Sequence, residues 1–465
     1  MTISSDKTPT YKIGDIEIYI DAGNRGPGEP VEFGALVTQL DIFQNLGNPY
    51  VTARIMYTDS ANFSNAVNIL GQEKVTIIMK DTEGEILLEK DFFITSLELS
   101  QKVGDDKSVN VMSLAEEHLL LNNSTRFSKT YEGKPNDICN NICFEQLGVN
   151  VRVSEPAEQK EMRVIIPYTM TPLNAAQWMA KRCTTKKGIP YLFYSKISEQ
   201  NELRLDSLFS LLSEDDNPAV NDDPIVFGTL SYEDGSSGED DDKIRKKITN
   251  YTIKSSENSL LAMIRSMYGG YYNWVNTIED MVSHEYIHSL QEDLGKVPKP
   301  NGENMPYNYD PEFSMMGGRP YHEGQNTYTS QITTGKLFDP TPLMSYAEEK
   351  NPQDHMNKVT ARTLFSFLDQ QPIDITLPAS QVGFGFDVLG RIVEIEIPKD
   401  LPITTDENAK DTVDKKRSGK YLVCGLKHTV FGDVFNVVMT LTKIDTDVAL
   451  GEEKDKLHGI GQREY

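Results

Sequence analysis

The chain has 465 residues, a hydrophobic share of 38%, a mean hydropathy of -0.45 and a net charge of -24 at pH 7. A chain of this length exceeds one ordinary core, so roughly two to four domains are expected. No apolar run approaches the roughly 20 residues that a spanning helix needs, which excludes a membrane span. The acidity argues against a dedicated nucleic-acid binder, because Lys and Arg on phosphates supply most of that affinity.

The N-terminus and the cysteines point to an intracellular fold without metal or redox motifs. The stretch MTISSDKTPTYK lacks the basic start, apolar core and cleavage site of a secretory signal, so folding in a cytoplasm is expected. Cys139, Cys143, Cys183 and Cys424 form neither a zinc knuckle nor a CxxC pair. Cys139 and Cys143 share a helix face at i, i+4, but two sulfurs make only half of a tetrahedral zinc site. Buried free thiols are the favoured interpretation.

A first strand-rich domain is predicted over residues 1–122. Residues 36–58 read as two strands broken at Gly47, Asn48 and Pro49, a turn cluster that predicts a hairpin. The other elements expected here are a short helix and three strands, at residues 61–70, 75–80, 86–100 and 108–114.

A different pattern predicts a small α+β middle domain over residues 123–228. Two helices are expected at residues 135–146 and 173–184, with a strand at 149–153 between them. Trp178 and Met179 lie among small residues, which favours a packing role over ligand stacking. The acidic, turn-rich residues 213–224 are interpreted as a linker at the end of this domain.

A second strand-rich domain is predicted in two pieces, residues 229–282 and 372–447. The expected strands and helix lie at residues 246–254, 257–266, 373–377, 391–397, 420–431 and 434–444. Gly432 and Asp433 form a two-residue link that suits a type II′ hairpin turn. Strands plus one short helix repeat the order of the first domain, so the chain is predicted to be α+β, mainly β, with two antiparallel β-barrel domains.

The two pieces are separated by an insertion, and a polar tail follows them. Residues 283–371 are rich in Pro, Gly, Asn, Tyr and Met, with helical patterning near both ends. Residues 448–465 form the predicted C-terminal tail.

Three stretches, taken in order, resemble one known family. LVTQLDIFQNLGNPYVTARIMYTDSANFSNAVNILGQEKVTIIM is similar to an opening tube domain. YEGKPNDICNNICFEQLGVNVRV followed by PLNAAQWMAKRCTTKKGIPYLFY is similar to a middle domain, and SGKYLVCGLKHTVFGDVFNVVMTLTKID, with His428, looks like a closing hairpin. On these residues the chain resembles hub proteins from the baseplates of contractile-tailed bacteriophages, which are related to the base of type VI secretion spikes.

The resemblance implies a structural, non-enzymatic role in a virion. It implies a homotrimer in which each chain gives two tube domains to a six-barrel ring, adapting a sixfold tail tube to a threefold central spike. The implied partners are the central spike protein, the tail tube initiator or tube protein, the tape measure protein and the surrounding baseplate wedge proteins. DNA and the tape measure would pass through an acidic lumen without specific binding. Compact relatives lack an insertion like residues 283–371, whose role stays unassigned.

The alternative function is a zinc metallopeptidase. His284, Glu285, Tyr286, Ile287 and His288 fit HExxH, in which two histidines one helical turn apart bind zinc and the glutamate activates water. The sequence allows a helix over residues 278–294, with Glu303 or another carboxylate as third ligand. The Gly- and Pro-rich residues after 295 do not suit the second helix that such a site needs. Surface histidines on an insertion helix are the favoured interpretation.

Two further motifs have ordinary explanations. Glu239, Asp240, Asp241 and Asp242 read as a solvated loop, with a metal site or lumen exposure as the alternatives. The glycine-rich residues 383–390 lack the GK[ST] ending of a phosphate loop and are interpreted as a barrel loop. No catalytic, metal-binding or cofactor-binding residue is therefore predicted, and no cofactor.

Overall fold

A computed structural model gives the fold. It describes residues 15–21, 30–59, 63, 69, 71–81, 83–102, 107–158, 161–213, 225–227, 248–253, 269–276, 283–289, 315–316, 319–320, 328–333, 357, 360–361, 364–365, 372–379, 385–395, 397, 418–432 and 434–444.

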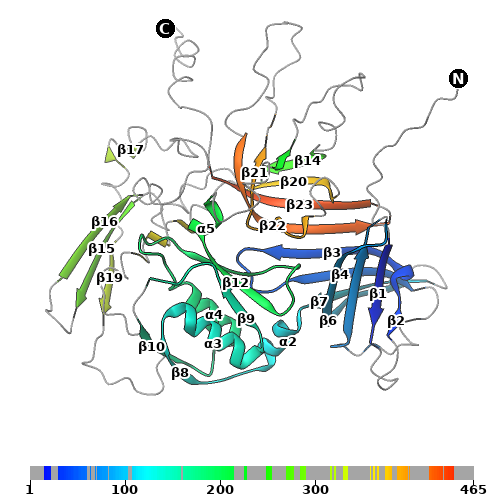
Figure 1. Cartoon of the computed structure of the whole chain (residues 1–465), viewed down its shortest axis with the longest axis horizontal. Coiled ribbons are helices and arrows are strands. Elements are labelled where there is room, and N and C mark those ends of the chain that lie inside the picture. Colours follow the sequence, from blue (N-terminus) through cyan, green and yellow to red (C-terminus); the bar gives the residue numbers. More distant parts are fainter. Residues whose placement is uncertain are drawn as a thin grey trace, which may run out of the picture.

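One large, mainly antiparallel sheet runs through the molecule (Figure 1). Its strands, in spatial order, are β14 (Asn250–Ile253), β20 (Ile373–Pro378), β23 (Val434–Lys443), β22 (Gly419–Phe431), β3 (Val37–Asn45), β4 (Thr52–Asp59), β7 (Ser108–Ala115), β6 (Ile86–Lys102), β5 (Lys74–Lys80), β1 (Asp15–Ile20) and β2 (Val31–Glu32). Beside β22 lies β21 (Ile392–Ile395), which also pairs in parallel with β13 (Ile225–Phe227). The predicted α+β, mainly β class is confirmed. Closure of either half into a barrel stays a prediction.

Two halves of this sheet are built in the same way. In the first, the spatial order is β3-β4-β7-β6-β5, and in the second it is β14-β20-β23-β22-β21. In both halves the strands, counted along the chain, lie in the spatial order first, second, fifth, fourth, third. Every neighbouring pair is antiparallel. The two halves therefore repeat one strand order, while the short helix that the sequence pattern predicted in each lies largely outside the described residues.

Alternating burial holds the sheet on its core. In β5, Val75, Ile77 and Met79 are fully buried while the residues between them are partly exposed, the period of two expected of a half-buried strand. Ordinary area arguments give about 1.5–3 kcal/mol for each such aliphatic side chain. At the β22–β23 turn, Phe431 pairs with Val434, and Gly432 has a φ of 55°, which only glycine adopts readily. The predicted two-residue hairpin is confirmed.

The middle region forms a separate core around two packed helices, α3 (Pro135–Leu147) and α4 (Pro172–Ala180). Proline opens each helix, and Gly148, with a φ of 70°, ends α3. The remaining elements are α2 (Glu117–Ser124), β8 (Lys129–Gly133), β9 (Asn150–Val153), β10 (Met162–Ile166), β11 (Tyr191–Ser195), β12 (Glu202–Ser207) and α5 (Leu208–Leu212). Figure 1 shows α3 and α4 below the large sheet.

A three-stranded sheet lies in the stretch between β14 and β20. Its central strand β15 (Gly269–Asn276) pairs with β16 (Ser283–Ser289) and β19 (Tyr328–Thr333). The other short elements are β17 (Met315–Met316), β18 (Arg319–Pro320) and, before β3, η1 (Gly34–Leu36). The expected helix over 278–294 is wrong where the structure describes it, because residues 283–289 are extended and pair with β15. Residues 257–266 and most of 61–70, both expected to be helical, lie outside the described residues.

Candidate assembly surfaces

The two halves of the large sheet meet in one ladder between β3 and β22. Pairing runs from Gln39 opposite Phe431 to Asn45 opposite Gly425. Across it, Thr429 Oγ1 donates to Asp41 Oδ1 at 2.8 Å, and Lys427 Nζ lies 3.3 Å from the same oxygen. Cross-strand pairs of this kind contribute about 0.2–1 kcal/mol each. The chain therefore contains one complete junction between its first and second strand-rich halves.

The face of the sheet that points away from the core is polar, with its charges paired. Arg54 lies 3.2 Å from Glu98, with both side chains about half exposed, and Lys74 lies 2.8 Å from Asp91. Thr52, Thr76, Thr376, Thr429 and Thr440 add hydroxyls to this face, which we call the outer sheet face.

A third ion pair lies at the β1–β5 end of the outer sheet face. The Lys80 ammonium hydrogen-bonds the Glu17 carboxylate and lowers the pKa of that carboxyl, and Tyr19, which donates to the same group, lowers it further. Together with the Lys427–Asp41 contact, four cations on this face each have a carboxylate partner. These four cations are therefore already neutralised and are poor ligands for a phosphate backbone.

A hollow of about 210 Å³ opens where β1, the start of β3 and the β22–β23 turn meet. Its lining is mixed, with Asp15, Ile16 and Gln39 among the residues that line it. Beside it, Phe431 and Val434 at the hairpin tip are 58% and 51% exposed. This corner therefore exposes two apolar side chains of the β22–β23 hairpin to solvent.

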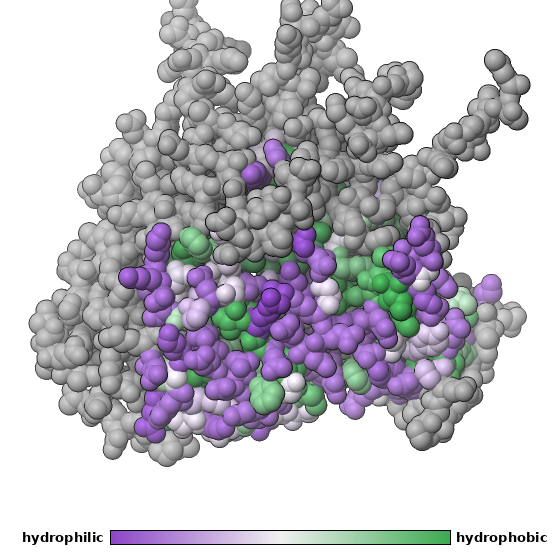
Figure 2. Space-filling view, viewed as in Figure 1, coloured by the Kyte–Doolittle hydropathy of each residue, from purple (hydrophilic) through white to green (hydrophobic). Residues whose placement is uncertain are grey.

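Exposed apolar side chains are spread over several elements. Figure 2 shows hydrophobic residues gathered right of centre, while the described part of the lower half of this face is largely hydrophilic. The large apolar residues that are exposed in the described parts are Phe43, Ile86, Leu97, Leu121, Phe144, Tyr168, Ile253, Phe431 and Val434.

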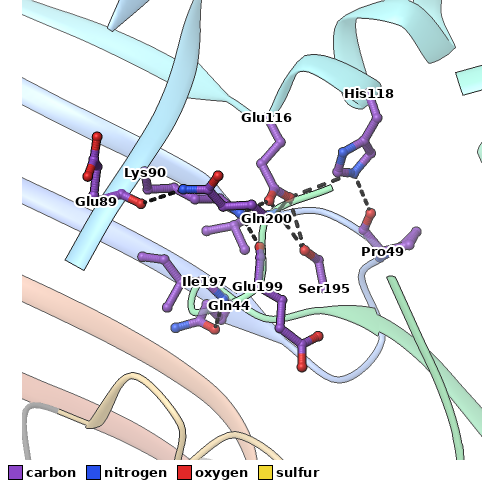
Figure 3. Close-up of polar contacts among 11 residues, drawn as sticks. Gln44, Pro49, Glu89, Lys90, Glu116, His118, Ser195, Ile197, Glu199 and Gln200 are labelled. Atoms are coloured by element: carbon purple, nitrogen blue, oxygen red, sulfur yellow. Dashed lines mark hydrogen bonds and ion pairs between the residues drawn. The ribbon is translucent and has the colours of Figure 1, made fainter. Parts of the chain in front are cut away.

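A buried polar network ties the middle region to the first half of the sheet (Figure 3). Glu116, which follows β7, forms an ion pair with Lys90 of β6 at 2.7 Å, and the two side chains are 7% and 4% exposed. The same carboxylate accepts from Val51 N at 2.7 Å and from Ser195 Oγ at 3.1 Å. Lys90 Nζ donates to the Glu199 carbonyl at 2.6 Å. Further hydrogen bonds thus surround the charge pair, the condition under which its attraction can offset the cost of burying two charges.

The turn between β11 and β12 completes this contact. Ile197 N donates to Gln44 Oε1 at 3.0 Å, and Gln200 Nε2 donates to the Glu89 carbonyl at 3.1 Å. His118 Nε2 lies 2.8 Å from the Pro49 carbonyl and 3.7 Å from Glu116. These groups share one interface, so the network is interpreted as a structural clasp rather than a catalytic site.

A second cluster of charges lies just beyond this clasp. Tyr194 donates to Asp206 at 2.6 Å, and burial raises the pKa of the Asp206 carboxyl. Burial, reinforced by the nearby Arg204 guanidinium, lowers the pKa of Lys196. Arg204 in turn binds Glu199 through two nitrogens. The charged groups of this cluster therefore bind one another.

The cysteines lie where the sequence placed them. Cys139, Cys143 and Cys183 are buried free thiols, and Cys424 is partly buried. A hydrogen bond to Cys143 together with burial raises the pKa of the Cys139 thiol, so it resists ionisation. No group of three or more metal-ligating side chains occurs in the described part of the chain. The preferred interpretation of these thiols as packing residues agrees with their positions: Cys139, Cys143 and Cys183 lie in the core of the middle region, and Cys424 packs against the core of the large sheet.

The two histidines of the HExxH motif do not lie on a helix, which a zinc site of this type needs. His284 and His288 lie on the strand β16, where four residues span about 13 Å along the backbone, against about 6 Å on a helix. Glu303 and Glu239–Asp242 lie outside the described residues, as do residues 383–384 of the glycine-rich loop. Residues 385–390 form turns. No helix among the described residues has the length and apolar character to span a bilayer.

Solved structures with a similar fold come from phage tails. The 43 kDa tail protein of prophage MuSo2 from Shewanella oneidensis matches with a TM-score of 0.52 and 11% identity, covering 93% of this chain and 100% of that chain. A tail protein from Neisseria meningitidis MC58 matches with a TM-score of 0.50 and 10% identity, covering 92% and 96%. The chain has the fold of phage tail proteins. A type VI secretion component from E. coli gives a TM-score of 0.40 at 11% identity, covering 92% and 77%.

These likenesses are of fold, since no family model and no curated protein matches the sequence. Sequence reasoning missed the Lys90–Glu116 clasp and the β3–β22 junction. Both join residues far apart in the chain, and neither follows a local pattern. The one available signal was a lysine at an inward position of a strand, which predicts a buried partner of opposite charge.

Proposed function

We propose that the chain is a structural hub of a contractile phage tail baseplate. In this proposal three copies form a ring that adapts the sixfold tail tube to the threefold central spike. The observation that carries it is the pair of sheet halves with the same strand order and orientation, joined side by side through β3 and β22. The fold shared with two phage tail proteins supports it.

The physical argument concerns symmetry. Three chains, each with two similar halves, present six similar units around an axis, although the sequence repeats only three times. One side of such a ring can contact six identical tube subunits through equivalent backbone positions. The other side can contact three spike chains through residues that differ between the halves. Closure of the ring also covers strand edges that would otherwise pair without limit.

Transport through the ring agrees with the charge of the chain. A net charge of -24 disfavours binding of phosphate, and four cations on the outer sheet face are already paired. We place this face at the channel, where tape measure protein and DNA pass without specific binding. The proposed partners are the central spike, the tube initiator or tube protein, the tape measure and the wedge proteins, in a virion assembled in the host cytoplasm.

The zinc peptidase alternative has lost its structural support. Its histidines lie on a strand, and the two phage-tail structures of similar fold argue for a structural, non-enzymatic role. We therefore propose that the chain is not an enzyme.

Light scattering and negative-stain images of the purified chain test the proposed function. The expected result is a mass of three copies and rings with a central opening. A monomer at all concentrations, or an open filament, would contradict it. Mixing with a tail tube protein of the same phage should place the ring at the tube end.

A further inference from the structure

The two halves of the large sheet can be aligned residue by residue from their pairing. β6 has an irregularity between Ile94 and Ser96, opposite Leu114 and Ser113 of β7. β22 has one between Val423 and Gly425, opposite Leu441 and Thr440 of β23. The next residues, Leu97 and Leu426, lie opposite Met112 and Met439. Leu97 and Leu426 therefore hold equivalent positions in the two halves.

Leu97 and Leu426 differ in the strands that lie beside them and in their exposure to solvent. Beyond its irregularity, β22 has β23 on one edge and β3 on the other. β6 has β7 on one edge there, whereas on the other edge the described residues supply no strand beyond Ile94. Leu426 is accordingly 3% exposed and Leu97 is 53% exposed. The edge of β6 beyond Ile94 thus lacks a partner among the described residues, whereas the matching edge of β22 is paired with β3.

The strand equivalent to β3 in the second half is β14, and one of its edges has no partner among the described strands. β3 fills the edge of β22, and β14 holds the position of β3 in the second half. Ile42 of β3 lies opposite Ala53, and Ile253 of β14 lies opposite Ile373, at matching places. Ile42 is fully buried, while Ile253 is 39% exposed. Among the described strands, β14 pairs with β20 alone.

We propose that β14 of one copy adds antiparallel to the free edge of β6 in a second copy, so that the junction between chains repeats the β3–β22 junction within the chain. Main-chain hydrogen bonds would give affinity, and burial of Leu97 and Ile253 would fix the register. Each copy carries both the edge and the strand, so the contact is head to tail. The inference rests on the proposed function only for the number of copies, three, that closes the ring.

The register of this contact follows from the internal one. β6 has a second irregularity, between Leu97 and Leu99, that β22 lacks, so positions beyond it are matched through their partners on β7 and β23. Ile42 pairs with His428, which lies opposite Val437, and Ser100 lies opposite Asn110 at the matching place in β7. Ile253 of one copy should therefore lie opposite Ser100 of the next. Directly opposed, hydrogen-bonded residues have Cα atoms about 5.5 Å apart, within the range of a disulfide.

Single substitutions test the contact first. Leu97→Asp and Ile253→Asp each place a carboxylate in the proposed ladder, and each should weaken self-association about 100-fold or more, giving monomers by sedimentation. Phe144→Asp, at a 58% exposed position on α3 away from the sheet, is the matched control and should stay a trimer. Trimers formed by both edge variants would overturn the inference.

Mixing the two edge variants is a sharper test, because it distinguishes a lost contact from a lost fold. The Leu97→Asp copy keeps an intact β14, and the Ile253→Asp copy keeps an intact β6. An equimolar mixture should therefore form a dimer with a single junction, although each variant alone is monomeric. A mixture that stays monomeric would overturn the head-to-tail contact.

Cross-linking tests the register. In a Ser100→Cys, Ile253→Cys double variant, mild oxidation should link copies covalently into dimers and trimers, whereas each single variant should not. A wild-type trimer whose edge variants still trimerise and whose cysteines do not link would refute this inference and leave the proposed function intact. A wild-type monomer would refute both.

Discussion

Removal of the cation from the buried clasp should loosen the middle region from the sheet. In Lys90→Met the side chain keeps its length but loses its charge, so Glu116, 7% exposed, is left as a buried carboxylate without its ion-pair partner. Breaking a buried pair from one side costs about 3–5 kcal/mol. The donors that remain, Val51 N and Ser195 Oγ, already bind Glu116 and cannot replace the ammonium. We expect a loss of that size in the free energy of unfolding.

The neighbouring residue on the same strand gives the matched control. Asp91 forms its ion pair with Lys74 on the exposed side of the sheet, with side chains 47% and 39% exposed. Asp91→Asn should cost less than about 1 kcal/mol, because exposed pairs contribute little. Because both residues lie on β6, the difference between the two losses in the free energy of unfolding measures the effect of burial rather than strand propensity.

A second substitution separates charge from packing. In Lys90→Met with Glu116→Gln neither member of the ion pair carries a charge, and the glutamine oxygen still accepts from Val51 N. Urea unfolding followed by tryptophan fluorescence should show that the double variant recovers most of the stability that Lys90→Met loses. The reasoning is refuted if Lys90→Met costs less than about 1 kcal/mol, or if Glu116→Gln brings no recovery.

Three further perturbations have defined outcomes. Burial holds the pKa of Lys196 below 10.5, so its charge costs stability at neutral pH; Lys196→Met should raise the melting temperature at pH 7, with the gain shrinking as pH rises towards 10.5. A thiol reagent at pH 8 should modify only Cys424 rapidly in the native protein and all four cysteines in urea, whereas rapid labelling of more than one would contradict the buried positions. Gly188 has a φ of 83°, and a Cβ there would lie 3.0 Å from Thr360 Cβ, so Gly188→Ala should cost more than about 1 kcal/mol in urea unfolding, while an unchanged midpoint would refute the close approach.

Local chemistry made much of the fold predictable. Pro135 favours the start of a helix and Gly148 favours its end, so these two residues predict the bounds of α3 from the local sequence. Gly432 likewise fixes the last hairpin, because few other residues accept its φ of 55°. In both cases the deciding interactions lie within a few residues.

Prediction failed where distant partners decide the conformation. Residues 283–289 have a spacing compatible with a helix, yet β15, itself paired with β19, holds them as a strand. The β3–β22 junction joins Asp41 to Thr429, and a sequence pattern cannot reveal that contact. The same limit hid the contrast between Leu97 and Leu426, because the two leucines differ only in what covers them.

The cross-strand pairing of Ile253 with Ile373 means that the intervening stretch leaves and re-enters the sheet at one point. The last part of this stretch is held to the rest of the molecule, because Leu364 is fully buried in the core of the large sheet and Thr360 lies close to Gly188. Changes in this stretch that keep the packing of Leu364 and the separation of the two ends should leave the large sheet unchanged. A foreign domain whose own termini lie close together can be inserted directly after Ile253, with Leu364 kept in place.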